Sequence, residues 1–450
     1  MPYIPVTEKQ KLRMLKTIGF NNIQELLENI DSELVKPRTW NLPPGLSEQQ
    51  LVNHLEVIKK MNLDLTTLQC YAGGGIYDHY IPAAVDHLVS RPEFYTAYTP
   101  YQAEVSQGTL QSIFEYQSMI AELTGMDVAN ASMYDGATAF AEALIMSAKI
   151  TKKNKILIAD SIHPHDADVI NTYLQFQYSV QQIPHSEKGI LDANDLKNLI
   201  DDNTAAVGIA SPNFFGNLEN LSNLIDLIHD HHALAVIKVN PLSLSILTPP
   251  GHLNADIVVG EGQTLGLNPN FGGPLLGIFA VKRDYLRHMP GRIIGETVDA
   301  QGRTGYVMTL QTREQHIKRE RATSNICTNQ ALCALTSTVY MALLGRSGLE
   351  TAARNSLILA HQLQQELTEI PGVSLKFNSD YFNEFVVELP CSADLIVNSM
   401  IGENILGGIS LGKYNRDWQN LLMIAVTEKR TPQDLKHYVD VFKQCLNTYI

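Results

Sequence analysis

The sequence predicts an α/β protein with a mostly parallel sheet in a large domain and a smaller C-terminal α+β domain. The first observation is an alternation of short apolar runs with stretches of helical length between about residues 111 and 281. Such alternation is typical of parallel strands joined by crossover helices. The second is composition: the 450 residues are 44% hydrophobic and 18% charged, which suffices for a large core divided between two lobes.

Three segments follow from this pattern. Residues 1–60 are polar with helical periodicity, and Ser47-Glu48-Gln49-Gln50 is a capping-box pattern that precedes apolar residues at helical spacing. We expect an N-terminal helical arm there, which packs on another surface and takes no part in chemistry. Residues 61–345 are expected to form the large α/β domain, and residues 346–450 the small domain.

The strands expected in the large domain are 155–159, 178–183, 205–210, 234–239, 256–259 and 277–281. The helices expected around them are 111–124, 138–150, 166–176, 193–201, 219–231 and 329–344. A break at residues 345–348 precedes the small domain, with helices 349–368 and 432–447 and strands 373–377, 384–389 and 421–426. Ligands of such sheets bind at the carboxyl ends of the strands, so we expect the site there.

Charge and cysteine content exclude several classes of protein. The formal net charge of −13 argues against a nucleic-acid-binding surface. The five cysteines are scattered without a CxxC pair, which indicates reduced thiols and a cytoplasmic location. We expect neither a signal peptide nor a membrane-spanning helix. The run His229-Asp230-His231-His232 is interpreted as a solvated helix end, and no metal site is expected.

The glycine-rich stretch 260–274 follows the apolar run 255–259 and is the first candidate for the site. Glycines allow positive φ and close approach of the backbone to a ligand. The GxGxxxG spacing resembles a dinucleotide-binding loop only loosely, because it lies late in the chain and no helix follows it. Gln263 stands at its centre, and an amide is neither a nucleophile nor a base.

Other candidates lie at further strand ends and helix starts. Gly136 and Thr138 open a helix whose backbone N–H groups either hold a phosphate or form an ordinary N-cap turn. His163 either stacks on a planar cofactor ring or belongs to a polar loop. Lys238 lies inside a strand, where a charge is costly unless it is paired or reaches solvent. The loops 71–77 and 95–102 are rich in tyrosine, which fits a functional loop or a subunit interface.

Over nearly its full length the chain resembles the N-terminal (alpha) subunit of the two-subunit P proteins of the glycine cleavage system, a family of glycine dehydrogenases (aminomethyl-transferring). The segments that carry the resemblance are Tyr98–Gly108, Asn130–Ala139, Gly262–Gly266, Gly291–Asp299 and Ser324–Gln330. Their order and spacing, rather than any one motif, make the match specific.

The resemblance implies a pyridoxal-phosphate-dependent transferase of fold type I. In such enzymes a lysine holds the cofactor, and Gln263 stands at the matching position, with Gly262 in place of the family's histidine. Asn240 stands where an acid would hold the pyridine nitrogen. The resemblance therefore implies a vestigial pocket rather than a catalytic one. Its expected residues are Gly136, Thr138, His163, Asn240, Gln263 and Thr264. A site rebuilt around Lys238 is the alternative.

The resemblance also implies a homologous partner, subunit 2, that carries pyridoxal phosphate, and a lipoylated H protein that receives the aminomethyl group of glycine. Residues lent to the shared active site are expected to be Tyr95, Tyr98, Gln102, Glu104, Gln107, Ser324 and Asn325. The last two are expected near the partner's cofactor phosphate. A heterodimer and an α2β2 heterotetramer both fit. The competing functions are a stand-alone pyridoxal-phosphate-dependent amino-acid decarboxylase and a non-catalytic scaffold of the same fold.

Overall fold

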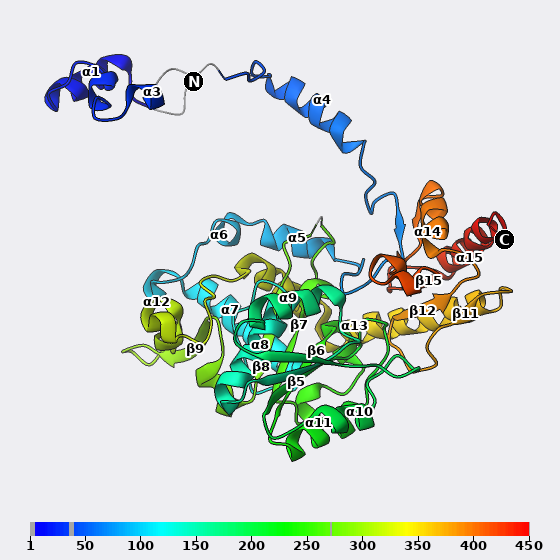
Figure 1. The fold of residues 1–450 in the computed structure, drawn as a ribbon. Coiled ribbons are helices and arrows are strands. Elements are labelled where there is room, and N and C mark those ends of the chain that lie inside the picture. Colours follow the sequence, from blue (N-terminus) through cyan, green and yellow to red (C-terminus); the bar gives the residue numbers. More distant parts are fainter. Residues whose placement is uncertain (1–4, 36–39, 271, 450) are drawn as a thin grey trace. The chain divides into compact units, whose positions relative to one another are not determined.

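The computed structural model describes residues 5–35, 40–270 and 272–449 (Figure 1). The chain divides into two compact units, Met1–Leu63 and Asp64–Ile450. The first contains helices α1 (Glu8–Thr17), α2 (Ile23–Leu26), α3 (Ser32–Val35) and α4 (Glu48–Lys59). The predicted capping box at Ser47 is confirmed. Leu15 is the only buried side chain among those described in this unit. Because isolated short helices are marginal in water, these helices need another surface to pack on.

The large sheet of the second unit has the predicted parallel character. Its strands are β2 (Val128–Ala129), β3 (Lys155–Ala159), β4 (Ser179–Ile183), β5 (Thr204–Ala210), β6 (Leu234–Val239), β7 (Ile257–Glu261) and β8 (Gly277–Val281). Their order is β2-β8-β7-β6-β5-β3-β4. Strands β4, β3, β5, β6 and β7 run parallel, and β8 and β2 are antiparallel to their neighbours. All six predicted strands are present; β2 is too short to stand out in sequence.

Helices cover both faces of this sheet, as its continuous apolar strands require. They are α7 (Gln107–Thr124), α8 (Gly136–Thr151), α9 (Pro164–Leu174), α10 (Ala193–Leu199) and α11 (Leu221–Asp230). Figure 1 shows α10 and α11 on the side of the strands away from α9. Helix α8 contacts strands β5, β6, β7 and β8. Its apolar side chains are buried almost all round, as expected of a central helix.

Helix α13 (Ala331–Thr368) connects the two lobes of the second unit. At Gly345 its φ is 57° and its ψ is −175°, so the helix is broken there, as predicted. By length and composition alone α13 could cross a membrane. However, Tyr340 is buried in the core of the large sheet and Leu363 in the core of the C-terminal lobe. The buried apolar residues of α13 thus belong to the two cores that it joins.

The C-terminal lobe is α+β, as predicted. Its antiparallel sheet has the order β11-β12-β15-β14, with β11 (Ser374–Leu375), β12 (Glu384–Glu388), β14 (Ile409–Ser410) and β15 (Leu421–Ala425). Helices α14 (Ala393–Gly402) and α15 (Pro432–Asn447) pack against each other. Strand β1 (Gln69–Cys70) pairs in parallel with β13 (Ile405–Leu406). The segment that enters the second unit is therefore attached to the C-terminal lobe before it reaches the large sheet.

A hairpin of β9 (Ile293–Val298) and β10 (Thr304–Thr309) was not among the predicted elements. Gln107, at the start of α7, holds it by accepting from the N–H of Tyr306 at 2.8 Å and donating to the Tyr306 carbonyl at 2.9 Å. The short helices α5 (Ala83–Val89), α6 (Pro92–Tyr95) and α12 (Gln315–Lys318) are also additional to the prediction.

Candidate functional site

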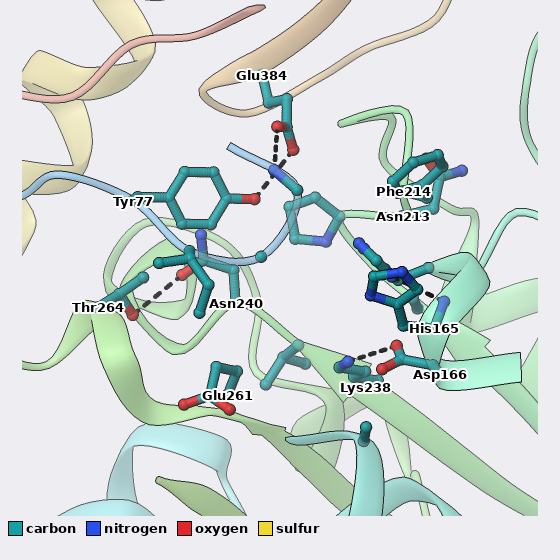
Figure 2. Close-up of a pocket in the computed structure, with 18 of the residues that line it drawn as sticks. Tyr77, His165, Asp166, Asn213, Phe214, Lys238, Asn240, Glu261, Thr264 and Glu384 are labelled. Carbon is teal, nitrogen blue, oxygen red and sulfur yellow. Dashed lines mark hydrogen bonds and ion pairs between the residues drawn. The ribbon is translucent and has the colours of Figure 1, made fainter. Parts of the chain in front are cut away.

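A cavity of about 260 Å³ lies at the carboxyl ends of the parallel strands, where sheets of this kind bind ligands (Figure 2). Its walls come from the ends of β5, β6 and β7, the starts of α8 and α9, and the loop 74–77. Of the predicted pocket residues, His163, Asn240 and Thr264 line it. Gly136, Thr138 and Gln263 do not line it, although their sequence neighbours Asp135, Ala137 and Thr264 do.

Gln263 is a buried structural residue. Its side chain is 1% exposed, its Oε1 accepts from the N–H of Tyr77 at 2.9 Å, and its Nε2 donates to the carbonyls of Tyr77 at 2.9 Å and Leu267 at 2.6 Å. All the hydrogen bonds are to main-chain groups, and they join the short helix Gly262–Thr264 to the loop that closes the cavity. The amide thus fastens the loop and has no free group to offer a ligand.

The start of helix α8 is occupied by the chain's own carboxylates. Asp135 accepts from the N–H of Thr138 at 2.7 Å in a capping box. Glu261 accepts from the N–H of Gly136 at 2.9 Å and from that of Leu276 at 2.9 Å. Burial raises the pKa of Glu261 to about 7. Helix starts attract anions through these N–H groups, and here two of the first three are already satisfied from within the chain.

Lys238 reaches the cavity from β6 and forms an ion pair with Asp166 of α9 (Figure 2). Asp166 is buried and Lys238 is 17% exposed. An amine held by a carboxylate in this way is not free to act as a nucleophile. The pair also answers the question that the sequence left open: the Lys238 side chain points to the ligand end of the strand, where its charge is paired.

His163 caps helix α9 instead of standing free for a flat ligand. Its Nδ1 accepts from the N–H of His165 at 3.0 Å, and its ring meets that of Phe214 edge-on with centroids 4.9 Å apart. Burial lowers the pKa of His163 to about 4, so the ring is neutral at physiological pH, with its proton on Nε2. The ring is therefore fixed in both orientation and tautomer.

Asn240 follows β6 and lines the cavity beside Thr264 (Figure 2). Its Oδ1 accepts from the N–H of Leu242 at 3.1 Å and from the Thr264 hydroxyl at 3.4 Å. Its Nδ2 is buried without a hydrogen-bond partner among the described residues. Asn240 therefore offers an amide at this position, and not the carboxylate that would hold the protonated ring nitrogen of a cofactor.

Glu384 also lines this cavity, and nothing in the sequence pointed to it beyond its place in a predicted strand. Its carboxylate accepts from the Tyr77 hydroxyl at 2.9 Å and from the N–H of Gly74 at 2.7 Å. Its side chain is buried, and burial raises its pKa to about 7. A Cβ on Gly73 would meet Glu384 Oε1 at 2.0 Å, so this part of the loop requires glycine. Glu384 thus ties the cavity loop to the C-terminal sheet.

The raised pKa of Glu384 predicts a specific pH dependence of stability. Between its usual value of 4.5 and about 7, the folded state keeps the proton that the unfolded state releases. Stability from this group is therefore present below pH 4.5 and is lost as the pH rises through 7. The change in the free energy of unfolding caused by Glu384→Gln should be more favourable at pH 8 than at pH 5 by about 2.5 kcal/mol. Urea unfolding at both pH values measures the difference; equal effects would contradict it, and exposed Glu187→Gln is the control.

The residues predicted to be lent to a partner lie in two separate places. Tyr95 and Tyr98, which are 65% and 84% exposed, line a groove beside the start of α13. Ser324 and Asn325 line a different, polar cavity, where the Ser324 hydroxyl donates to buried Glu142 at 2.7 Å. Gln102 and Glu104 are exposed. Gln107 is engaged with the β9–β10 hairpin.

No group of three or more metal-ligating side chains was found in the described part of the chain. The His229 run, interpreted in sequence as a helix end, does close helix α11. His229 Nε2 is hydrogen-bonded to buried Asp256 at 2.8 Å, and Lys282 forms an ion pair with the same carboxylate at 2.6 Å. This cluster fastens the helix to the sheet rather than forming a binding site.

Comparisons with known proteins agree with this architecture. The family model of the glycine cleavage system P-protein matches residues 1–442. The "probable glycine dehydrogenase (decarboxylating) subunit 1" of Desulforamulus reducens is 47% identical over 437 residues, covering 97% of this chain and 98% of the relative. The protein of the same name from Chlorobium limicola is 47% identical over 440 residues, covering 98% and 99%.

Among solved structures, an inhibitor-bound glycine decarboxylase (P-protein) of the glycine cleavage system superposes with a TM-score of 0.92 at 38% identity. It covers 99% of this chain and 100% of that one. The glutamate decarboxylase of Lactobacillus brevis has a TM-score of 0.67 at 13% identity, covering 93% and 96%, and shows a shared fold only.

Proposed function

The chain belongs to the family of glycine cleavage system P-proteins, and from this premise we propose that it is the subunit of a two-subunit glycine dehydrogenase that does not itself hold the cofactor. Its fold is that of pyridoxal-phosphate-dependent enzymes of fold type I. The observation that carries the proposal is that Glu261 and Lys238 in the cavity, and Gln263 just after Glu261 in sequence, are all engaged by other groups of the chain.

The residues of this cavity do not fit pyridoxal phosphate. The cofactor requires an amine for its aldehyde, donors for its phosphate and, in this fold, an acid for its ring nitrogen. Here Gln263 is an amide bonded to the main chain, and the start of α8 is filled by Asp135 and Glu261. Lys238 places a cation, paired with Asp166, among the groups that line the cavity. We therefore place pyridoxal phosphate on the homologous second subunit.

The same misfit disfavours a stand-alone amino-acid decarboxylase. Lys238 is the only lysine that lines the cavity in the described part of the chain, and it is held in an ion pair with Asp166. A non-catalytic scaffold would retain the fold, but full-length relatives named as a dehydrogenase subunit favour a role within an enzyme.

In the proposed complex this chain contributes surface to the partner's active site. The exposed tyrosines of the loop that follows α6 support this, because large aromatic side chains are rarely left in solvent without a partner surface. The proposed contributors are Tyr95, Tyr98, Gln102, Glu104, Gln107, Ser324 and Asn325. Of the pair near the proposed cofactor phosphate, Ser324 already donates to Glu142. Asn325 is thus the better placed donor of the two.

We further propose that the complex decarboxylates glycine and transfers the aminomethyl group to the lipoyl arm of H protein. The reduced cysteines support a cytoplasmic location for this assembly, which cell fractionation would test.

The proposal predicts that glycine–CO2 exchange depends on both subunits. Each purified subunit with added pyridoxal phosphate should show background exchange, and the mixture should be active and respond to H protein. Exchange by this chain alone, or no gain on mixing, would contradict the proposal. In the active mixture, alanine at Asn325 should raise the pyridoxal phosphate concentration needed for half-maximal exchange more than alanine at Ser324 does.

A further inference from the structure

The groove that contains Tyr95 and Tyr98 has a volume of about 190 Å³ and lies outside the cavity described above. It is bounded by the loop 94–100, helix α7, strand β9 and the start of α13. Most of its polar lining is neutral, and it contains one cationic side chain, Arg292. Arg292 lies just before β9 in one of the segments by which the sequence resembles its family, and the proposed function leaves it without a role.

Arg292 is a buried cation with only neutral partners. Its side chain is 9% exposed, Nη2 donates to the Cys327 carbonyl at 2.8 Å, and Nη1 donates to Asn329 Oδ1 at 3.3 Å. The ring of Tyr101 lies 5.8 Å from the guanidinium carbon. Within residues 5–35, 40–270 and 272–449, no carboxylate forms an ion pair with Arg292, and Nε donates no hydrogen bond.

The two other buried arginines are satisfied differently. Arg430 is paired with Asp78 at 3.0 Å. Arg313 donates from Nε, Nη1 and Nη2 to the carbonyls of Leu310, Met289 and Gly291. Burying a charge is unfavourable unless it is paired and hydrogen-bonded. Arg292 therefore lacks both the carboxylate partner of Arg430 and the three carbonyl acceptors of Arg313, and its fork matches the geometry of a carboxylate.

We propose that Arg292 binds a carboxylate that this chain does not supply, at the face where the two subunits share their active site. The inference rests on the proposed function, because the exposed tyrosines around Arg292 belong to the loop assigned to that face. The carboxylate comes either from glycine or from an acidic side chain of the second subunit. In both cases the groove is completed by the partner, and the tyrosines screen the ion pair from water.

The test uses the reconstituted two-subunit complex with Arg292→Gln. Three quantities are measured: the Kd of the two subunits, the KM for glycine, and the inhibition constant of acetate, which carries a carboxylate but no amine. Arg303→Gln is the matched control, since Arg303 is 75% exposed and pairs with Asp299 on the nearby hairpin. Arg292→Lys keeps the charge but loses the fork, and shows whether charge alone restores part of the effect.

Truncating one partner of a buried charged pair weakens binding at least about 30-fold. If the carboxylate is that of glycine, Arg292→Gln should raise KM and the acetate constant by this factor and leave Kd unchanged. If it belongs to the second subunit, Kd should rise by this factor and KM at saturating partner should not. Both results support the proposal. Changes below about threefold in all three quantities, as in Arg303→Gln, overturn it. The Kd of the two subunits can be measured without enzymatic activity. Failure of this proposal is therefore distinguishable from failure of the proposed function, in which the native pair of subunits would show no glycine–CO2 exchange.

Discussion

Replacing Gln263 by alanine should lower the free energy of unfolding by about 3–5 kcal/mol. The change removes the acceptor of the Tyr77 N–H and the donor to the carbonyls of Tyr77 and Leu267, all in a buried region. Each buried polar group left without a partner costs about 1–3 kcal/mol. Water that enters the space left by the side chain recovers part of this loss, so the effects do not add fully.

Urea unfolding of the native protein and of Gln263→Ala, followed by circular dichroism, measures this loss. Gln301→Ala is the control, because Gln301 is exposed, and a surface substitution of this kind changes stability by less than about 0.5 kcal/mol. A loss below about 1 kcal/mol for Gln263→Ala would mean that the amide does not fasten the loop. The loop should then also show unchanged susceptibility to proteolysis.

The fold was predictable because the buried strands of the large sheet are recognisable in the sequence as short hydrophobic runs. All seven residues of β5 are buried, so the strand reads as an uninterrupted apolar run between polar turns. The β9–β10 hairpin escaped prediction for the opposite reason. Only the first two residues of β9 are buried, and Gly295 and Glu296 interrupt the pattern. Its strands are held by Gln107, which lies 199 residues before Tyr306, and no local pattern reports such a contact.

The candidate site was predictable in place but not in detail. The sequence located Gln263 at a strand end and showed that it offers no nucleophile. Its role as a fastener depends on Tyr77, which lies 186 residues away. Glu384 meets Gly74 across 310 residues and therefore had no sequence signal. Glu261 lies two residues from Gln263, yet its contact with Gly136 arises only because β7 places it against the start of α8.

The cavity differs from a cofactor site in more than the absence of a lysine at position 263, because its charged groups are also engaged within the chain. Glu261 and Asp135 supply the hydrogen-bond acceptors that the N–H groups at the start of α8 require. Lys238 is neutralised by Asp166, and Glu384 holds the loop against the C-terminal sheet. The charged groups of the cavity thus have partners within the chain, whereas the Asn240 Nδ2 is buried without one among the described residues.

Introducing lysine at position 263 should consequently fail to produce a cofactor site. After incubation of Gln263→Lys with pyridoxal phosphate and reduction with borohydride, mass spectrometry should find residue 263 unmodified, to within a few per cent. An ammonium has three donors and no acceptor. It would donate to the carbonyls of Tyr77 and Leu267, and these hydrogen bonds favour the charged, unreactive form of the amine. The Tyr77 N–H would be left without its acceptor.

The second subunit, on which we propose that the cofactor is held, provides the positive control in the same reaction, and Gln263→Ala provides the background. Modification of residue 263, or glycine–CO2 exchange by Gln263→Lys without its partner, would refute this account. A double variant that also carries Glu261→Gly separates two causes. If modification appears only in the double variant, the carboxylate at the start of α8 excludes the cofactor phosphate. If it appears in neither, the ion pair of Lys238 with Asp166 and the amide of Asn240 suffice to keep the cofactor out.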